Sequence, residues 1–143
     1  MIFVVERKDC VKILALYLPQ FHSIPENDKW WGKGYTEWTA VKNAKPLFAN
    51  HYQPRIPLDN NYYDLSNNSG KTWFWQAELA RKFGIYGFCI YHYWFEGKQL
   101  LERPMEILRD RKEIDIIYCF CWANETWSRN LYAQERTVLL EQR

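Results

Sequence analysis

Motifs that hold phosphate groups or metal ions are missing from this sequence. It contains no G-x-G-x-x-G turn, no G-x-x-x-x-G-K-[ST] loop and no D-x-D motif of the kind that holds the metal ion of a nucleotide-sugar enzyme. No group of His, Asp and Glu residues has metal-ligand spacing, and the cysteines form no C-x-x-C pair. We therefore expect neither a metal site nor another bound cofactor.

Long apolar runs and an excess of charge of one sign are also missing. No run approaches the roughly 20 apolar residues that span a bilayer. The segment MIFVVERKDC at the N-terminus is too short and too charged for a signal peptide. The formal net charge of the 143 residues is +2, and Lys and Arg are scattered along the chain. These absences predict a soluble, cytoplasmic protein with no membrane span and no nucleic-acid partner.

Cysteines are few, whereas aromatic residues are abundant. Cys10, Cys89, Cys119 and Cys121 are expected to be reduced core residues, and their spacing places Cys119 and Cys121 on one face of a strand. Aromatic residues make up 18% of the chain, with eight tryptophans and ten tyrosines, and many lie between the predicted strands and helices. Aromatic rings in clefts stack on the C–H face of sugars, which favours a carbohydrate partner.

Apolar runs and helical patterns alternate along the chain. Buried strands are predicted over 12–18, 85–95 and 114–121, and helices over 71–83 and 100–111, with Pro104 in the first turn of the second helix. Between them, residues 19–70 hold five of the six prolines and many aromatics, and we expect an irregular but ordered functional loop. The order strand, long loop, helix, strand, helix, strand predicts a parallel α/β sheet.

Two parallel architectures fit this order of elements. A doubly wound nucleotide-binding fold normally has a glycine-rich turn after its first strand, but here that strand continues into PQFH. In a (β/α)8 barrel one unit takes roughly 30 residues, which is about the spacing of the second and third strands. The barrel is therefore favoured, and the chain would supply about three of its βα units.

Several long motifs resemble one family. The segments YLPQFHSIPENDKWWGKGYTEW, KPLFANHYQPRIPLD, QAELARKFGIYGFCIYHYWFEGKQLLERP and CFCWANETWSR closely resemble the WbsX-like glycosyltransferase family, also described as glycoside hydrolase family 99-like. The resemblance extends from about residue 12 to residue 142. Residues 1–11 do not share it and are expected to form a variable leader.

The resemblance implies a fold and a role. It implies a TIM-like (β/α)8 barrel and a part in bacterial cell-surface polysaccharide metabolism, in O-antigen or capsule. Residues 12–143 would then be the N-terminal portion of a single barrel domain that is truncated at its C-terminus. A carbohydrate substrate is expected, and a nucleotide-sugar donor stays an open alternative.

Polar and aromatic side chains follow all three predicted strands, at the end where a barrel binds its ligands. Glycosyl transfer generally uses two carboxyl groups, and Glu125 and Glu37 are the catalytic candidates. The aromatic loop is expected to place Glu37 and Trp38 over the same strand ends as Glu125. The expected substrate-binding residues are Gln20, His22, Trp38, His92, Tyr93, Trp94, Trp122, Asn124 and Trp127.

Alternatives to catalysis remain open at this stage. Glu125 could cap the next turn or pair with Arg129, and Glu37 could be an ordinary loop residue. In the related endo-mannosidases the catalytic carboxylates come late in the barrel, so the true pair could follow residue 143. Hydrolysis and transfer both fit, as do a carbohydrate-binding domain without catalysis and an inactive fragment of such an enzyme.

Overall fold

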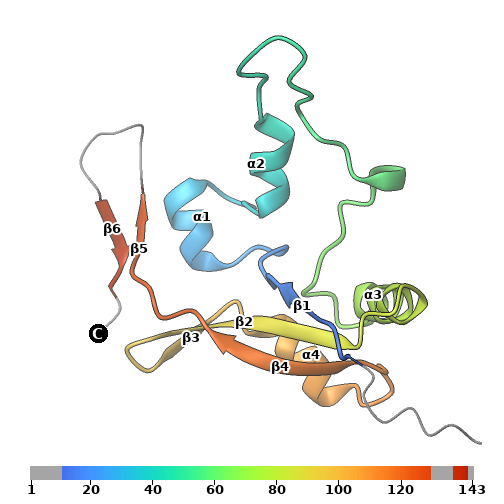
Figure 1. Cartoon of the computed structure of the whole chain (residues 1–143). Helices are drawn as coiled ribbons and strands as arrows, with labels where there is room; N and C mark the ends of the chain where they lie inside the picture. Colours follow the sequence, from blue (N-terminus) through green and yellow to red (C-terminus); the bar gives the residue numbers. More distant parts are fainter. Residues whose placement is uncertain (1–10, 130–136, 142–143) are drawn as a thin grey trace, which may run out of the picture.

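A parallel sheet forms the centre of the protein. The computed structural model describes residues 11–129 and 137–141. Strands β1 (Leu14–Tyr17) and β4 (Ile117–Trp122) pair in parallel with opposite edges of β2 (Gly87–Phe95). Consecutive parallel strands are thus spatial neighbours, and helices connect them, as the sequence predicted for an α/β fold (Figure 1).

Both connecting helices cover the same face of this sheet. Helix α3 (Lys71–Lys82) and helix α4 (Arg103–Asp110) supply Trp73 and Ile107 to one core cluster, together with Phe88 and Ile90 of β2. Side chains alternate between the faces of a strand, so Phe88 and Ile90 point toward the helices. This face is the packed core, because Ile90 and Trp73 are both almost fully buried.

The other face of the sheet is apolar, and part of it is open. Leu16 of β1 is 69% exposed and Ile117 of β4 is 48% exposed. Cys119 was expected in the core, yet it is exposed, and Cys121 is only half-buried. Both do lie on one face, as predicted. A second core cluster covers this face at the carboxyl end of β2, but the part next to Leu16 and Ile117 is open. Cys10 lies outside the described residues.

Gly87 is the first residue of β2, and a side chain at this position would collide with the neighbouring strand β4. A Cβ atom at this position would lie 2.3 Å from the carbonyl oxygen of Ile117 on β4. We expect Gly87→Ala to lower the free energy of unfolding by about 1–3 kcal/mol, because the strands must separate to accommodate the methyl group. Urea unfolding checks this, with Cys119→Ala on the open face as a control that changes stability by less than about 0.5 kcal/mol. An unchanged midpoint for Gly87→Ala would contradict the close strand packing.

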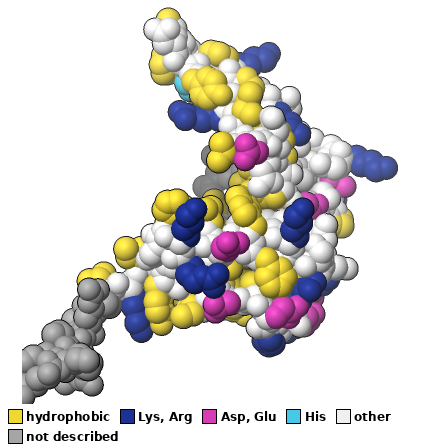
Figure 2. Space-filling view, turned by 90° about the vertical axis from the view of Figure 1, so that its right-hand side faces the viewer, with side chains coloured by type: hydrophobic (Ala, Val, Ile, Leu, Met, Phe, Trp, Pro, Cys, Tyr) yellow, Lys and Arg dark blue, Asp and Glu magenta, His cyan; other side chains and the backbone are white. Residues whose placement is uncertain are grey.

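The long segment between β1 and α3 is ordered, as expected, but it is not irregular throughout. It contains α1 (Pro25–Trp31), α2 (Glu37–Asn43) and the 3-10 turn η1 (Leu58–Asn60). In Figure 1 α1 and α2 lie beyond the carboxyl end of β1. The segment 44–57 projects away from the core, and Leu47 and Phe48 are exposed there. Figure 2 shows hydrophobic side chains on this projection, and acidic side chains between the basic ones on the rest of that face.

Two short antiparallel pairings were not predicted. Strand β3 (Lys98–Leu100) folds back on the end of β2, so the helix expected from residue 100 begins only at Arg103, with Pro104 in its first turn. Strands β5 (Trp127–Arg129) and β6 (Thr137–Leu140) form a separate two-stranded sheet. None of the helices among the described residues is long and apolar enough to cross a membrane.

Candidate functional site

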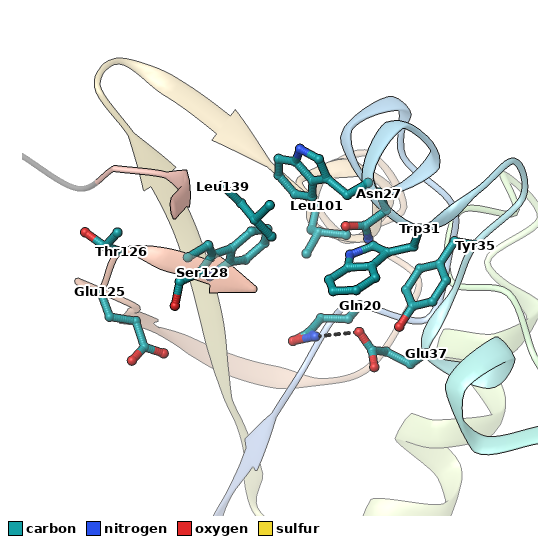
Figure 3. Close-up of a pocket in the computed structure, with 12 residues that line it drawn as sticks. Gln20, Asn27, Trp31, Tyr35, Glu37, Leu101, Glu125, Thr126, Ser128 and Leu139 are labelled. Atoms are coloured by element: carbon teal, nitrogen blue, oxygen red, sulfur yellow. Dashed lines mark hydrogen bonds between the residues drawn. The ribbon is translucent and has the colours of Figure 1, made fainter. Parts of the chain in front are cut away.

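A cavity of about 400 Å³ lies at the carboxyl ends of the parallel strands. It is bounded by the residue segments that follow β1 and β4, by α1 and the start of α2, and by the β5–β6 sheet (Figure 3). The lining residues are Gln20, Asn27, Trp30, Trp31, Tyr35, Glu37, Leu101, Glu125, Thr126, Trp127, Ser128 and Leu139.

A chain of hydrogen bonds connects the sheet to Glu37. The hydroxyl of Tyr93, near the end of β2, donates to the Gln20 side-chain oxygen at 2.8 Å. The side-chain amide nitrogen of Gln20 then donates to Glu37 Oε1 at 3.0 Å. Because Tyr93 is buried and Gln20 follows β1, the position of the Glu37 carboxylate is set by the sheet itself. In Figure 3 the Gln20 and Glu37 side chains meet at the cavity.

The rings of Trp30, Trp31 and Tyr35 form an aromatic wall of the cavity, and the turn between α1 and α2 holds this wall in place. Asp28 Oδ1 accepts hydrogen bonds from the backbone N–H groups of Gly34, at 2.9 Å, and Tyr35, at 3.2 Å. Gly34 has a positive φ of 77°, a conformation that glycine adopts without strain. The turn places the Tyr35 ring beside that of Trp31, with ring centroids 5.8 Å apart.

Trp127 and Arg129 attach the β5–β6 sheet to the rest of the site. The Trp127 ring packs edge-on against Tyr93 and Phe95, with centroids 5.1 Å from each. Arg129 donates to the carbonyl oxygen of Trp30 and places its guanidinium carbon 4.4 Å from the centre of the Trp31 ring. Trp127 therefore both lines the cavity and holds the β5–β6 sheet in place.

Glu125 lies on the opposite side of the cavity from Glu37 and is exposed (Figure 3). The alternative in which it pairs with Arg129 is not realised, since no ion pair joins these two described residues. Glu125 and Glu37 come from segments 88 positions apart in the sequence (125 minus 37). The fold nevertheless brings both carboxylates to one cavity, as expected for loops that follow parallel strands.

Two tyrosines near the cavity have raised pKa values, in part because of the two carboxylates. Burial raises the pKa of Tyr93, and the neighbouring Tyr91 phenol and the carboxylates of Glu37 and Glu125 raise it further. Burial and then Glu37 likewise raise the pKa of Tyr35. Both hydroxyls therefore keep their protons at neutral pH, and that of Tyr93 stays a donor to Gln20.

Four of the eleven residues predicted for the site line the cavity, and a fifth supports it from behind. Gln20, Glu37, Glu125 and Trp127 line it, while Tyr93 contacts Gln20. The other predicted binding residues, His22, Trp38, His92, Trp94, Trp122 and Asn124, do not line it.

The structure gives His22 and Trp38 other surroundings. His22 is 1% exposed, and burial lowers its pKa, so the neutral ring is favoured there. The Trp38 indole nitrogen donates to the carbonyl oxygen of Tyr63 at 2.8 Å, and its ring packs on Phe21. Both residues belong to the segment between β1 and α3, and the contacts of Trp38 stabilise it from within.

His92, Trp94 and Trp122 lie on the helix-covered side of the sheet. His92 pairs with Trp122 across β2 and β4, and its ring lies 5.3 Å from that of Phe120. Tyr93 points the opposite way, because neighbouring residues of a strand alternate between faces. Asn124 is exposed just before Glu125.

Several lining residues were not predicted from the sequence. Trp30, Trp31 and Tyr35 belong to the motif WWGKGYTEW, which already contained Glu37 and Trp38, so their clustering around two glycines was the available signal. Thr126, Ser128 and Leu139 depend on the unpredicted β5–β6 sheet. Within residues 11–129 and 137–141, no three His, Cys, Asp or Glu side chains gather as metal ligands would.

This arrangement combines two carboxylates with broad aromatic surfaces. Carboxylates accept hydrogen bonds from hydroxyl groups and can exchange protons with a leaving oxygen. Indole and phenol rings pack against the C–H faces of sugars. The cavity is therefore suited to bind a polyhydroxylated ring and to act on a bond beside it.

Comparison with known proteins yields one family match. The family model described as Glycosyltransferase WbsX matches residues 13–143. Two relatives, each named Uncharacterized protein WxcX, come from Xanthomonas campestris pv. campestris strains B100 and ATCC 33913. Each is 47% identical over 130 residues, which cover 91% of this chain and 18% of the relative. The chain thus spans less than a fifth of these relatives' length, and no solved structure matches it.

Proposed function

Because the chain belongs to the WbsX glycosyltransferase family, we propose that its cavity binds a saccharide and takes part in making or cleaving glycosidic bonds. The process would be the metabolism of bacterial cell-surface polysaccharide. The observation that carries this proposal is the meeting of Glu37, Glu125 and the rings of Trp30, Trp31 and Tyr35 at one cavity.

The proposed roles follow from how each carboxylate is held. Glu37 is oriented by Gln20, so one of its oxygens is engaged and the other is available to a sugar hydroxyl or an anomeric carbon. Glu125 is exposed and is the better placed group to exchange a proton with solvent and with a leaving oxygen. We assign Glu125 as the acid/base group and Glu37 as the group that stabilises or attacks the reacting carbon.

We also propose that the sheet is the first part of a (β/α)8 barrel. Support comes from three parallel strands in sequence order, from the packing of α3 and α4 on one face of the described sheet, and from an opposite apolar face that is partly open and that a barrel interior would cover. In this proposal residues 12–143 form the N-terminal portion of the barrel domain and residues 1–11 a leader. The family match begins at residue 13, next to that boundary.

Saccharide binding at the cavity can be tested with two tryptophans of similar exposure. Trp31 lines the cavity and is 44% exposed, whereas Trp94 is 40% exposed and lies on the helix-covered side of the sheet. We expect Trp31→Ala to weaken binding of neutral oligosaccharides about tenfold and Trp94→Ala to leave it unchanged. Dissociation constants from a panel of neutral oligosaccharides check this. Equal losses in both variants, or a loss confined to Trp94→Ala, would place sugar binding elsewhere.

A further inference from the structure

Charge is distributed unevenly around the cavity. Both charged residues in its lining, Glu37 and Glu125, are acidic, and no Lys, Arg or His is among the lining residues that the structure describes. The negative charges of Glu37 and Glu125 influence the same part of the cavity, because both raise the pKa of the buried Tyr93. A ligand that enters the cavity therefore meets two negative charges without an opposing cation in the described wall.

Several cations lie near lining residues but outside the lining itself. Arg129 lies behind the aromatic wall, where it donates to Trp30 and contacts the Trp31 ring. Lys29 and Lys98 line a separate hollow of about 340 Å³ that shares Trp30 with the cavity. Lys98 forms an ion pair with Glu26 there. Of these three cations, none contributes to the lining of the cavity itself.

The aromatic rings of the cavity also favour positively charged ligands over negatively charged ones. The face of an indole or phenol ring carries negative electrostatic potential and attracts ammonium groups as well as C–H groups. Trp30, Trp31 and Tyr35 line the same cavity as the two carboxylates. A sugar with an ammonium group is attracted by both the rings and the carboxylates, whereas an anionic sugar is repelled by both.

We infer that the cavity selects saccharide units without negative charge, and that it binds an amino sugar more tightly than the neutral sugar of the same configuration. This inference rests on the proposed function, because it assumes that the cavity binds sugars. The two carboxylates weaken the binding of uronic acids. They repel the diphosphate of a nucleotide sugar as well, so a donor of that kind would place its diphosphate outside this cavity.

The test uses sugars that differ only in charge. Dissociation constants are measured by NMR titration at pH 7 and low ionic strength for glucose, galactose and mannose, for the 2-amino and uronic acid form of each, and for UDP-glucose. For any configuration that binds, we expect the amino sugar to bind about three- to tenfold more tightly than the neutral sugar, and the uronic acid more weakly by a similar factor. UDP-glucose is expected to bind no more tightly than glucose.

Variants that neutralise one or both carboxylates test whether the preference for the amino sugar arises from these two side chains. Glu37→Gln and Glu125→Gln are each expected to reduce the preference for the amino sugar, and the double variant to abolish it. Glu78→Gln, on an exposed position of α3 away from the cavity lining, is the matched control and should keep the full preference.

The outcomes separate this inference from the proposed function. Equal binding of neutral and uronic sugars, or a preference that survives the double variant, would overturn the inference. If neutral sugars still bind and Trp31→Ala weakens them, the proposed function stands without it. If sugars of all three charge types fail to bind, the proposed function fails and the inference with it.

Discussion

Glu125→Gln is expected to lower the turnover of glycosidic bonds by about 10²- to 10⁴-fold in a protein that contains the whole family domain. The amide has nearly the same shape as the carboxylate but cannot exchange a proton with a leaving oxygen. Because Glu125 is exposed, the free energy of unfolding should change by less than about 0.5 kcal/mol. Steady-state rates and urea unfolding of the two proteins measure both quantities.

The control for this substitution is Glu78→Gln, which removes a carboxylate of the same kind from the exposed side of α3. It should change neither turnover nor stability. A loss of stability in Glu125→Gln that matches its loss of turnover would indicate a structural role. Unchanged turnover would mean that Glu125 is not the catalytic acid.

The elements of the sheet could be predicted because burial leaves a clear pattern in the sequence. The strand around Ile90 is a continuous apolar run, and α3 repeats its apolar residues at helical spacing. Strand β3 was missed because it has only three residues. Its signal was the Glu96–Gly97 turn, where positive φ angles of 47° and 86° reverse the chain after β2.

Helix α1 was missed for a different reason. It has only seven residues, and its one buried residue is the polar Asn27, so it shows no apolar stripe. Tertiary contacts fix it instead: Arg129, which is 99 positions from Trp30 in the chain, donates to the Trp30 carbonyl oxygen at the end of the helix. Such a long-range contact leaves no local pattern in the sequence.

The position of the candidate cavity could be predicted, but only some of the residues that line it could. The rule that loops after parallel strands meet at one end brought Glu37 and Glu125 together correctly. It could not choose among His92, Tyr93 and Trp94, which are consecutive in a strand. Because neighbouring residues of a strand point to opposite faces, either Tyr93 or the pair His92 and Trp94 can face the cavity. In the structure Tyr93 does, and it contacts the lining residue Gln20.

The open face of the sheet gives the most direct test of the barrel proposal. Leu16 and Ile117 are exposed on it in this chain, but in a closed barrel the same side chains would point into the packed interior. An apolar surface beside unpaired strand edges also promotes association between copies of a chain. The same substitution on this face should therefore have opposite consequences in this chain and in a complete family domain.

Leu16→Lys is expected to leave the stability of the 143-residue chain within about 0.5 kcal/mol and to reduce its self-association. In a complete family domain it should lower the free energy of unfolding by at least about 3 kcal/mol, because the barrel interior would bury an unpaired charge. Light scattering and urea unfolding of both proteins measure these effects. Leu47→Lys is the control, since Leu47 is 83% exposed on the projecting segment 44–57 and should tolerate lysine in both. If the complete domain also tolerates Leu16→Lys, the face is open there too, and the sheet does not close into a barrel.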